Sequence, residues 1–160
     1  IVPTSGPVML EPDLMATAIQ ADLSRVGLKV TIRSYEWNAY LAEVNSGLDD
    51  DVHMAAMAWM TNDPSTLPYL TLRTAAQPPN GFNSGWYSNR ELDSLLDSAR
   101  TELDRDRRRA LYRRIDRLAH GDAPFLFVAS WRQILVARER VRGLALEPSF
   151  FLRFSEARAN

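Results

Sequence analysis

Cysteine is absent from the 160-residue sequence, and histidine occurs only twice. Without cysteine the chain can form no disulfide bond, no thiolate metal site and no cysteine nucleophile. The absence fits a reducing and an oxidising compartment equally well. His53 lies in an apolar segment and His120 near the predicted end of a helix, and neither has the spacing of a metal site or a nucleophile–base pair. We therefore expect no metal site and no histidine-based catalysis.

Strong charge of one sign is also missing. The 19 basic and 20 acidic residues leave a net charge of -1, so no overall field favours nucleic acid or an anionic membrane. Residues 105–117 are rich in arginine, but Asp106 and Asp116 interrupt them, as is usual on a solvated helix. The acidic run at residues 49–51 lacks the spaced ligands of a calcium loop, and no glycine-rich phosphate loop precedes a helix. No cofactor and no nucleic-acid partner are expected.

Long hydrophobic runs are missing too. No apolar stretch approaches the length of a membrane span, and no basic-then-apolar signal peptide is present. A hydrophobic content of 46% is nevertheless enough for the core of one domain of this length. The first residue is Ile1 rather than methionine, and we expect the chain to be a piece of a longer protein.

Helical and strand patterns alternate along the chain, which is typical of an α/β fold. After Pro12, apolar residues recur at helical spacing until Gly27. The predicted helices span residues 12–26, 37–44, 64–73, 88–103 and 104–121. The predicted strands span residues 28–33, 52–58, 125–129 and 134–137, of which the second is nearly all apolar and expected to be buried on both faces.

The last two predicted helices have local start signals. Ser88 and Glu91 have the spacing of a capping box, and the apolar stripe that follows is predicted to reach Leu103. Asp104 is the predicted cap of the next helix, which is expected to turn Leu111, Ile115 and Leu118 inward and to end at Gly121. Residues 74–87 form a long loop with Phe82, Trp86 and Tyr87, and loops of that length are often functional.

Aromatic and polar side chains follow two of the predicted strands. Ligands of α/β proteins bind beyond the carboxyl ends of strands, so a binding site is predicted there. Carboxylates suit a ligand ammonium group, and indole faces attract cations. The candidate ligand-binding residues are Tyr35, Glu36, Trp37, Trp59, Asn62 and Asp63.

Two other functions stay open on the residues alone. Glu36 and Asp63 would be the carboxylate pair of a hydrolase if their strand ends were adjacent. The loop aromatics, with the phenylalanines of the chain end, would instead form a protein-interaction module. Either tryptophan of the candidate site could also simply fill the core.

An ordered set of short segments runs through the chain. They are Ala18-Ile19-Gln20-Ala21-Asp22-Leu23, Val26-Gly27-Leu28-Lys29-Val30, Tyr35-Glu36-Trp37, Tyr40-Leu41, Ala58-Trp59, Asp63-Pro64, Tyr87-Ser88-Asn89, Leu92-Asp93, Arg109-Ala110-Leu111-Tyr112 and Asp122-Ala123-Pro124. In this order they resemble the C-terminal lobe of the peptide-binding proteins of ABC importers, solute-binding protein family 5, and the dipeptide-binding proteins most of all. The resemblance implies an α/β lobe of the periplasmic-binding-protein type over residues 1–146, with a mixed central sheet flanked by helices. The tail, residues 147–160, is expected to cross towards a missing N-terminal lobe.

The resemblance also implies a function. Such proteins are extracytoplasmic receptors, without catalytic activity, whose two lobes close on a peptide or similar solute and present it to a membrane permease. In the family an aspartate shortly after the tryptophan equivalent to Trp59 holds the ligand's amino group. Here Asn62 has that spacing and Asp63 follows it, and we expect Asp63 to be the anchor. Because Ser5-Gly6-Pro7 stands where dipeptide binders carry an arginine, oligopeptides, metal chelates and other solutes remain open as ligands.

Overall fold

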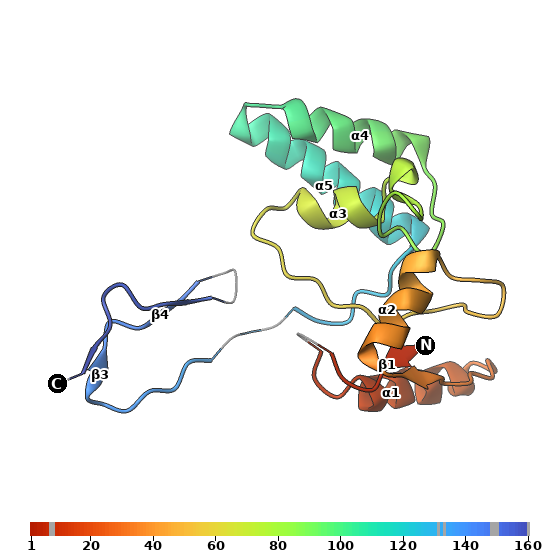
Figure 1. The fold of residues 1–160 in the computed structure, drawn as a ribbon. Coiled ribbons are helices and arrows are strands. Elements are labelled where there is room, and N and C mark those ends of the chain that lie inside the picture. The colour runs from red at the N-terminus through yellow and green to blue at the C-terminus, as the bar shows by residue number, and fades with distance from the viewer. Residues whose placement is uncertain (7–8, 131, 133, 148–150, 160) are drawn as a thin grey trace.

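The computed structural model describes residues 1–6, 9–130, 132, 134–147 and 151–159. In chain order the elements are β1 (Val2–Pro3), α1 (Pro12–Arg25), β2 (Ser34–Tyr35), α2 (Trp37–Ser46), α3 (Thr66–Thr71), the 3-10 helix η1 (Thr74–Ala76), α4 (Arg90–Thr101), α5 (Arg105–Asp122), β3 (Val141–Arg142), β4 (Ala145–Leu146), β5 (Leu152–Arg153) and β6 (Arg158–Ala159). Figure 1 shows three parts: an α/β unit with α1, α2 and β1, a helical unit with α3, α4 and α5, and a C-terminal hairpin. The helices predicted after Pro12 and at Trp37 are confirmed, whereas the third, α3, is shorter than predicted.

The centre of the α/β unit is a small parallel sheet. β1 pairs in parallel with β2. On its other side, the Ile1 nitrogen donates to the Met54 carbonyl at 2.7 Å, and the Ala56 amide donates to the Ile1 carbonyl at 3.0 Å. This is the bonding pattern of a parallel pair, so residues 54–56 extend the sheet as a third segment and β1 lies in the middle.

Two helices enclose the middle strand. Figure 1 shows β1 between α1 and α2, and both helices contact it. The chain moves from β1 to β2 through α1, and then returns past β1 to residues 54–56 through α2. Because both crossovers of such parallel units are right-handed, this reversal puts the helices on opposite faces. It also makes the carboxyl edge between β1 and residues 54–56 the point where strand order switches, which is where α/β proteins bind ligands.

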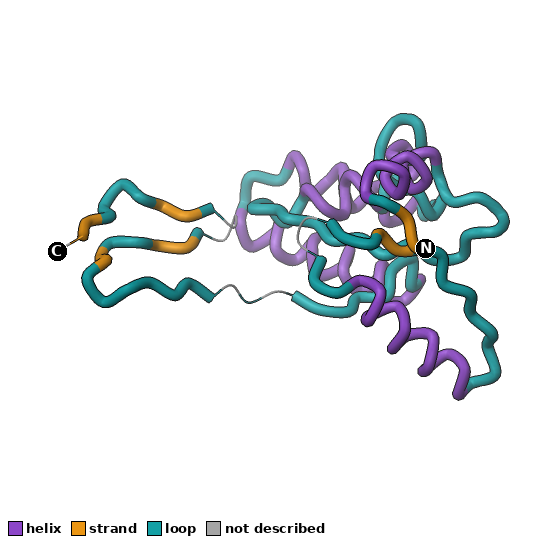
Figure 2. The backbone as a smooth tube through the Cα atoms, turned by 60° about the horizontal axis from the view of Figure 1, so that its bottom comes forward, coloured by secondary structure: helices purple, strands orange, loops and turns teal. Residues whose placement is uncertain are grey.

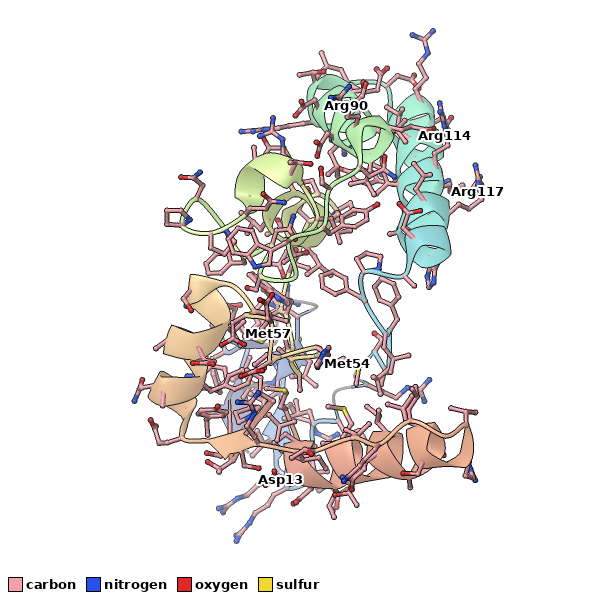
Figure 3. The ribbon with its side chains drawn as sticks, turned by 90° about the vertical axis from the view of Figure 1, so that its right-hand side faces the viewer. Asp13, Met54, Met57, Arg90, Arg114 and Arg117 are labelled. Carbon is pink, nitrogen blue, oxygen red and sulfur yellow. The ribbon has the colours of Figure 1, made fainter. Side chains whose placement is uncertain are left out.

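The sheet is smaller and more open than the sequence predicts. Of the predicted strand at residues 28–33, only the Arg33 carbonyl joins the ladder among the described residues, by accepting from the Val2 amide at 3.0 Å, and the paired strand itself is β2. The prediction that residues 52–58 are buried on both faces is wrong, because Met54 and Met57 are 45% and 36% exposed. One helix packs on this segment, where the Tyr40 hydroxyl of α2 donates to the Ala56 carbonyl. Figure 3 shows both methionines between α1 and the helical unit, where the described part of the chain gives them no full cover.

The core of the chain lies between α4 and α5. It is built from apolar residues at helical spacing on both helices, and Tyr69, Tyr87, Leu111, Tyr112 and Leu118 pack at its edge. The predicted inward position of Ile115 is confirmed, with 1% of its surface exposed. The buried members are Leu72, Leu92, Leu95, Leu96, Ala99, Ile115 and Ala119.

The caps of these two helices are partly as predicted. Asp104 accepts from the Arg107 amide at 2.8 Å and caps α5, as expected. The predicted capping box at Ser88 is wrong by one residue, because Asn89 caps α4 and accepts from two backbone amides. The helix α4 ends at Thr101, so Leu103 lies in the turn and is 94% exposed instead of packed.

Asn89 also ties the start of α4 to the end of α5. Its side-chain amide donates to Asp122 at 2.6 Å, and the Tyr87 hydroxyl donates to the same carboxylate oxygen at 2.5 Å. These bonds, that from Tyr87 first, hold the pKa of Asp122 below its usual value. Burial, followed by the bond to Asp122, raises the pKa of Tyr87 to about 12. The Asp122 carboxylate thus links α5 to both residues at neutral pH.

This link should make the stability of the fold depend on pH. A carboxyl group whose pKa is lowered by folding stabilises the fold above its unfolded pKa, about 4, and the contribution disappears as the pH falls. We expect the urea midpoint of the full-length protein to fall less between pH 7 and pH 3.5 in Asp122→Asn than in the unmodified protein. An equal fall of the urea midpoint in both proteins would show that the Asp122 link contributes nothing to stability.

The long predicted loop joins the two units. The Trp86 indole donates to the Leu48 carbonyl at 3.0 Å, and the Leu48 amide donates to the Ser84 carbonyl at 2.8 Å. Beside it, Gly47 has a φ of 96°, and a Cβ there would lie 2.8 Å from Trp86 Cε2. With Tyr87 bound to Asp122 and Phe82 packed on Trp59, all three loop aromatics are therefore engaged within the chain.

The end of the chain leaves the helical unit. The predicted strands at residues 125–129 and 134–137 are not formed in the described part of these segments, since no neighbouring strand pairs with them; residues 131 and 133 lie outside the description. Further on, β3 pairs antiparallel with β6 and β4 with β5, which forms the C-terminal hairpin. Figure 2 shows this hairpin apart from the helices. Of the predicted tail, residues 148–150 and 160 lie outside the described residues, and its crossing to another lobe stays a prediction.

Candidate ligand site at the strand ends

The end of β2 runs directly into α2. Glu36 is the N-cap, and its carboxylate accepts from the Asn38 amide at 2.9 Å and the Ala39 amide at 3.4 Å. A carboxylate in this position satisfies free amides and faces the positive end of the helix dipole. Trp37 is the first helical residue and stacks on Tyr40, with 6.0 Å between ring centroids. The Glu36 carboxylate is thus exposed to solvent but fixed in place by the helix.

The turn after β1 lies against this end of α2. A Cβ on Gly6 would be 2.7 Å from Cζ3 of Trp37, so the backbone of the turn rests on the indole ring. Only glycine allows that approach without movement of the ring. The Thr4 amide donates to the Tyr35 carbonyl at 2.8 Å, which fixes the two strand ends side by side. Tyr35, Glu36 and Trp37 therefore share one surface with the end of β1.

The third strand end carries the other aromatic residue. Trp59 is half-buried and packs edge-on against Phe82, with 5.2 Å between ring centroids. Phe82 comes from the long loop and is 43% exposed. The sequence places Phe82 only in a loop, because a single aromatic residue among glycine, proline and asparagine has no periodicity that would locate it. Asn62 is exposed beyond Trp59.

Asp63 is an exposed carboxylate held by a local turn. Its Oδ1 accepts from the Ser65 amide at 2.7 Å and from the Ser65 hydroxyl, and its carbonyl accepts from the Thr61 hydroxyl at 2.7 Å. The Ser65 bonds, with a smaller contribution from the charge of Arg108, keep the pKa of Asp63 below its usual value. Asp63 is therefore ionised at neutral pH, and Oδ2 has no hydrogen-bond partner within the described residues.

The two carboxylates of the candidate site are held in separate turns. Glu36 and Asp63 each bond within their own turn, and no hydrogen bond joins them in the described structure. No group of acidic or histidine side chains among the described residues could hold a metal ion. No helix of the described chain is long and apolar enough to cross a bilayer.

A surface pocket of about 220 Å³ lies elsewhere, and Figure 3 shows two of its arginines on α5, away from Met54 and Met57. Its lining is Glu91, Arg114, Arg117 and Leu118. Because an ion pair of 3.1 Å between Arg114 and Glu91 crosses it, this pocket is already part of the α4–α5 contact.

Comparison with known proteins gives the relationship. No protein-family model matches the chain. It is 29% identical over 144 residues to di/tripeptide-binding protein 4 of Pseudomonas aeruginosa. This aligned region covers 90% of this chain and 27% of that protein. It is also 29% identical over 149 residues to the dipeptide-binding protein of Escherichia coli. Here the aligned region covers 92% of this chain and 27% of that protein. The chain thus spans about a quarter of the length of these relatives.

Solved structures of peptide-binding proteins are also similar to this chain. The periplasmic binding protein DppA of Helicobacter pylori, in complex with the peptide STSA, matches with a TM-score of 0.64 and 30% identity over 77% of this chain and 23% of that one. The putative peptide binding protein AppA of Clostridium difficile matches with a TM-score of 0.82 and 18% identity, which shows the fold over 99% of this chain and 33% of that one. The chain is homologous to the dipeptide- and oligopeptide-binding proteins of ABC importers and has the α/β fold of periplasmic binding proteins.

Proposed function

We propose that this chain is one lobe of an extracytoplasmic receptor that captures peptides or similar small solutes for an ABC importer. The observation that carries the proposal is the match of about nine tenths of the chain to peptide-binding relatives. The rest of the protein supplies the opposing lobe, and a membrane permease receives the ligand. The receptor has no catalytic step, in keeping with its relatives, which are binding proteins.

The strand ends provide one half of the ligand site. Asp63 offers an ionised carboxylate with one free oxygen for the ligand's ammonium group, and Asn62 adds an amide next to it. Trp37 and Trp59 provide ring faces that exclude water and attract cations. Because affinity arises when two surfaces bury the ligand, this lobe alone should bind weakly.

The C-terminal hairpin is proposed to contact the opposing lobe. Phe151, Leu152 and Phe154 are 72%, 39% and 62% exposed, which is unusual for large apolar side chains near one another. A second lobe against the hairpin would remove this apolar surface from water. The hairpin would then fix the two lobes to each other as well as link them in sequence.

Loss of the Asp63 carboxylate should weaken ligand binding strongly. A charged hydrogen bond contributes about 1.5–3 kcal/mol, so Asp63→Ala in the full-length protein should raise the peptide Kd about tenfold to a hundredfold. Titration calorimetry with a short peptide measures this. Asp50→Ala is the matched control, because Asp50 is an exposed acid in the turn before the third strand segment, at the opposite edge of the sheet. An unchanged Kd in Asp63→Ala would remove Asp63 from the site.

A further inference from the structure

Basic residues are missing from one edge of the α/β unit. Residues 1–24 and 34–72 contain no lysine or arginine. The three basic residues between them, Arg25, Lys29 and Arg33, lie between the end of α1 and the start of β2, and therefore at the amino edge of the parallel sheet. The Arg33 side chain donates to the Asp51 carbonyl at 2.7 Å, and that residue precedes the third strand segment. The carboxyl edge is left without a cation from this unit.

The charged residues that residues 1–72 place at the carboxyl edge are all acidic. They follow the three strand ends, and each is exposed. The Asp13 carboxylate accepts from the Ser34 hydroxyl at 2.7 Å, which places the start of α1 beside β2 at this edge; Figure 3 labels Asp13 there. The set is Glu11, Asp13, Glu36 and Asp63.

The same edge offers apolar surface of an unusual kind. Met57 and Met60 are 36% and 46% exposed on either side of half-buried Trp59, and Phe82 packs on that tryptophan. Methionine is flexible and polarisable, so such a surface accepts linear side chains of varied shape. Lysine and arginine have an apolar stem and a cationic head, which suit methionine and a ring face respectively.

Two arginines of the helical unit, Arg73 and Arg108, form no ion pair with these acids in the described structure. Arg73 is paired with Asp97 at 3.0 Å and lies over the Tyr69 ring. Arg108 acts on Asp63 at a distance, and no ion pair joins them in the described structure. The charges that residues 1–72 place at the carboxyl edge are therefore all negative.

We infer that the ligand captured at this edge is a peptide with a cationic side chain, lysine or arginine, whose stem packs on the Met57, Trp59, Met60 and Phe82 surface. The inference rests on the proposed peptide-binding function and adds its substrate class. It concerns the side chains of the ligand. Because Asp63 is assigned to the ligand's amino terminus, the acids left for a cationic side chain are Glu11, Asp13 and Glu36.

Three tripeptides test this inference by titration calorimetry on the full-length protein. They are Ala-Lys-Ala, the same peptide with an acetylated lysine, and Ala-Glu-Ala. Acetylation keeps the stem and removes the charge, so Ala-Lys-Ala should bind at least tenfold more tightly than its acetylated form, and Ala-Glu-Ala most weakly. The difference in Kd between Ala-Lys-Ala and its acetylated form should narrow as added salt screens the charges of the carboxyl edge.

A pair of matched variants locates the source of the preference. Glu11→Gln/Glu36→Gln removes two acids from the carboxyl edge, leaves the amino-terminal anchor Asp63 in place and should reduce the ratio between the Kd values of the lysine and acetyl-lysine peptides. Asp22→Asn/Asp50→Asn removes two exposed acids from the amino edge and should leave that ratio unchanged. If the acetylated or the glutamate peptide binds as tightly as Ala-Lys-Ala, the inference is overturned while the peptide-binding function stands. If none of the three binds, the function itself is rejected, and the inference with it.

Discussion

Gly47→Ala should lower the free energy of unfolding by about 2–4 kcal/mol, because two separate costs coincide at this position. Gly47 has a φ of 96°, which L-residues rarely adopt. Its missing Cβ is also what allows Trp86 to approach the end of α2 and bond to the Leu48 carbonyl. Urea unfolding of the full-length protein, followed by circular dichroism, measures the loss.

Two further variants separate these costs. Gly27 also has a positive φ, 84°, but nothing lies within 4 Å of a Cβ there, so Gly27→Ala should cost only about 1 kcal/mol. In Gly47→Ala/Trp86→Ala the clash is removed, and the double variant should be more stable than the sum of the two single losses. If the losses add, or if both alanine variants cost the same, Trp86 does not require a glycine at position 47.

Leu92→Ala should cost about 3 kcal/mol, because this side chain is fully buried between α4 and α5. Its loss removes apolar burial and leaves a cavity in the core of the helical unit. The matched control is Leu103→Ala in the turn between the same two helices, where 94% of the side chain is exposed. This control should change the free energy of unfolding by less than about 0.5 kcal/mol. A comparable loss in both variants would contradict the packing of α4 against α5.

Leu103 shows why local patterns predict helices better than their ends. Its spacing continues the apolar stripe of α4, so periodicity alone includes it. The Glu102 carboxylate, however, accepts from the Asp104 amide at 2.9 Å, and Asp104 caps α5. Because a cap residue has an extended backbone, the start of α5 forces α4 to end earlier. The apolar spacing favours a helix through Leu103, but the Asp104 cap of α5 determines where α4 ends.

The α/β unit shows the opposite case, in which the outcome depends on distant contacts. The apolar composition of residues 52–58 indicates a strand, and its backbone does pair with Ile1. Burial, however, depends on what packs on each face, and Tyr40 of α2 contacts this segment while Met54 and Met57 stay exposed in the described structure. No local pattern records the presence or absence of such a cover.

The candidate site was predictable in its position but not in its contacts. The strand ends at Tyr35 and Trp59 follow from alternation and apolar composition. The contact of Trp59 with Phe82 and that of Gly6 with Trp37 join segments that are far apart in sequence. These long-range contacts decide which aromatic rings lie together at the candidate site.

The central claim is that the full-length protein captures peptides between this lobe and the rest of the chain. Titration calorimetry of the unmodified full-length protein with short lysine-containing peptides tests it most directly. The account predicts saturable binding of one peptide per protein, with a Kd in the micromolar range or below. Absence of any saturable heat with these peptides and with their neutral and acidic counterparts would contradict it.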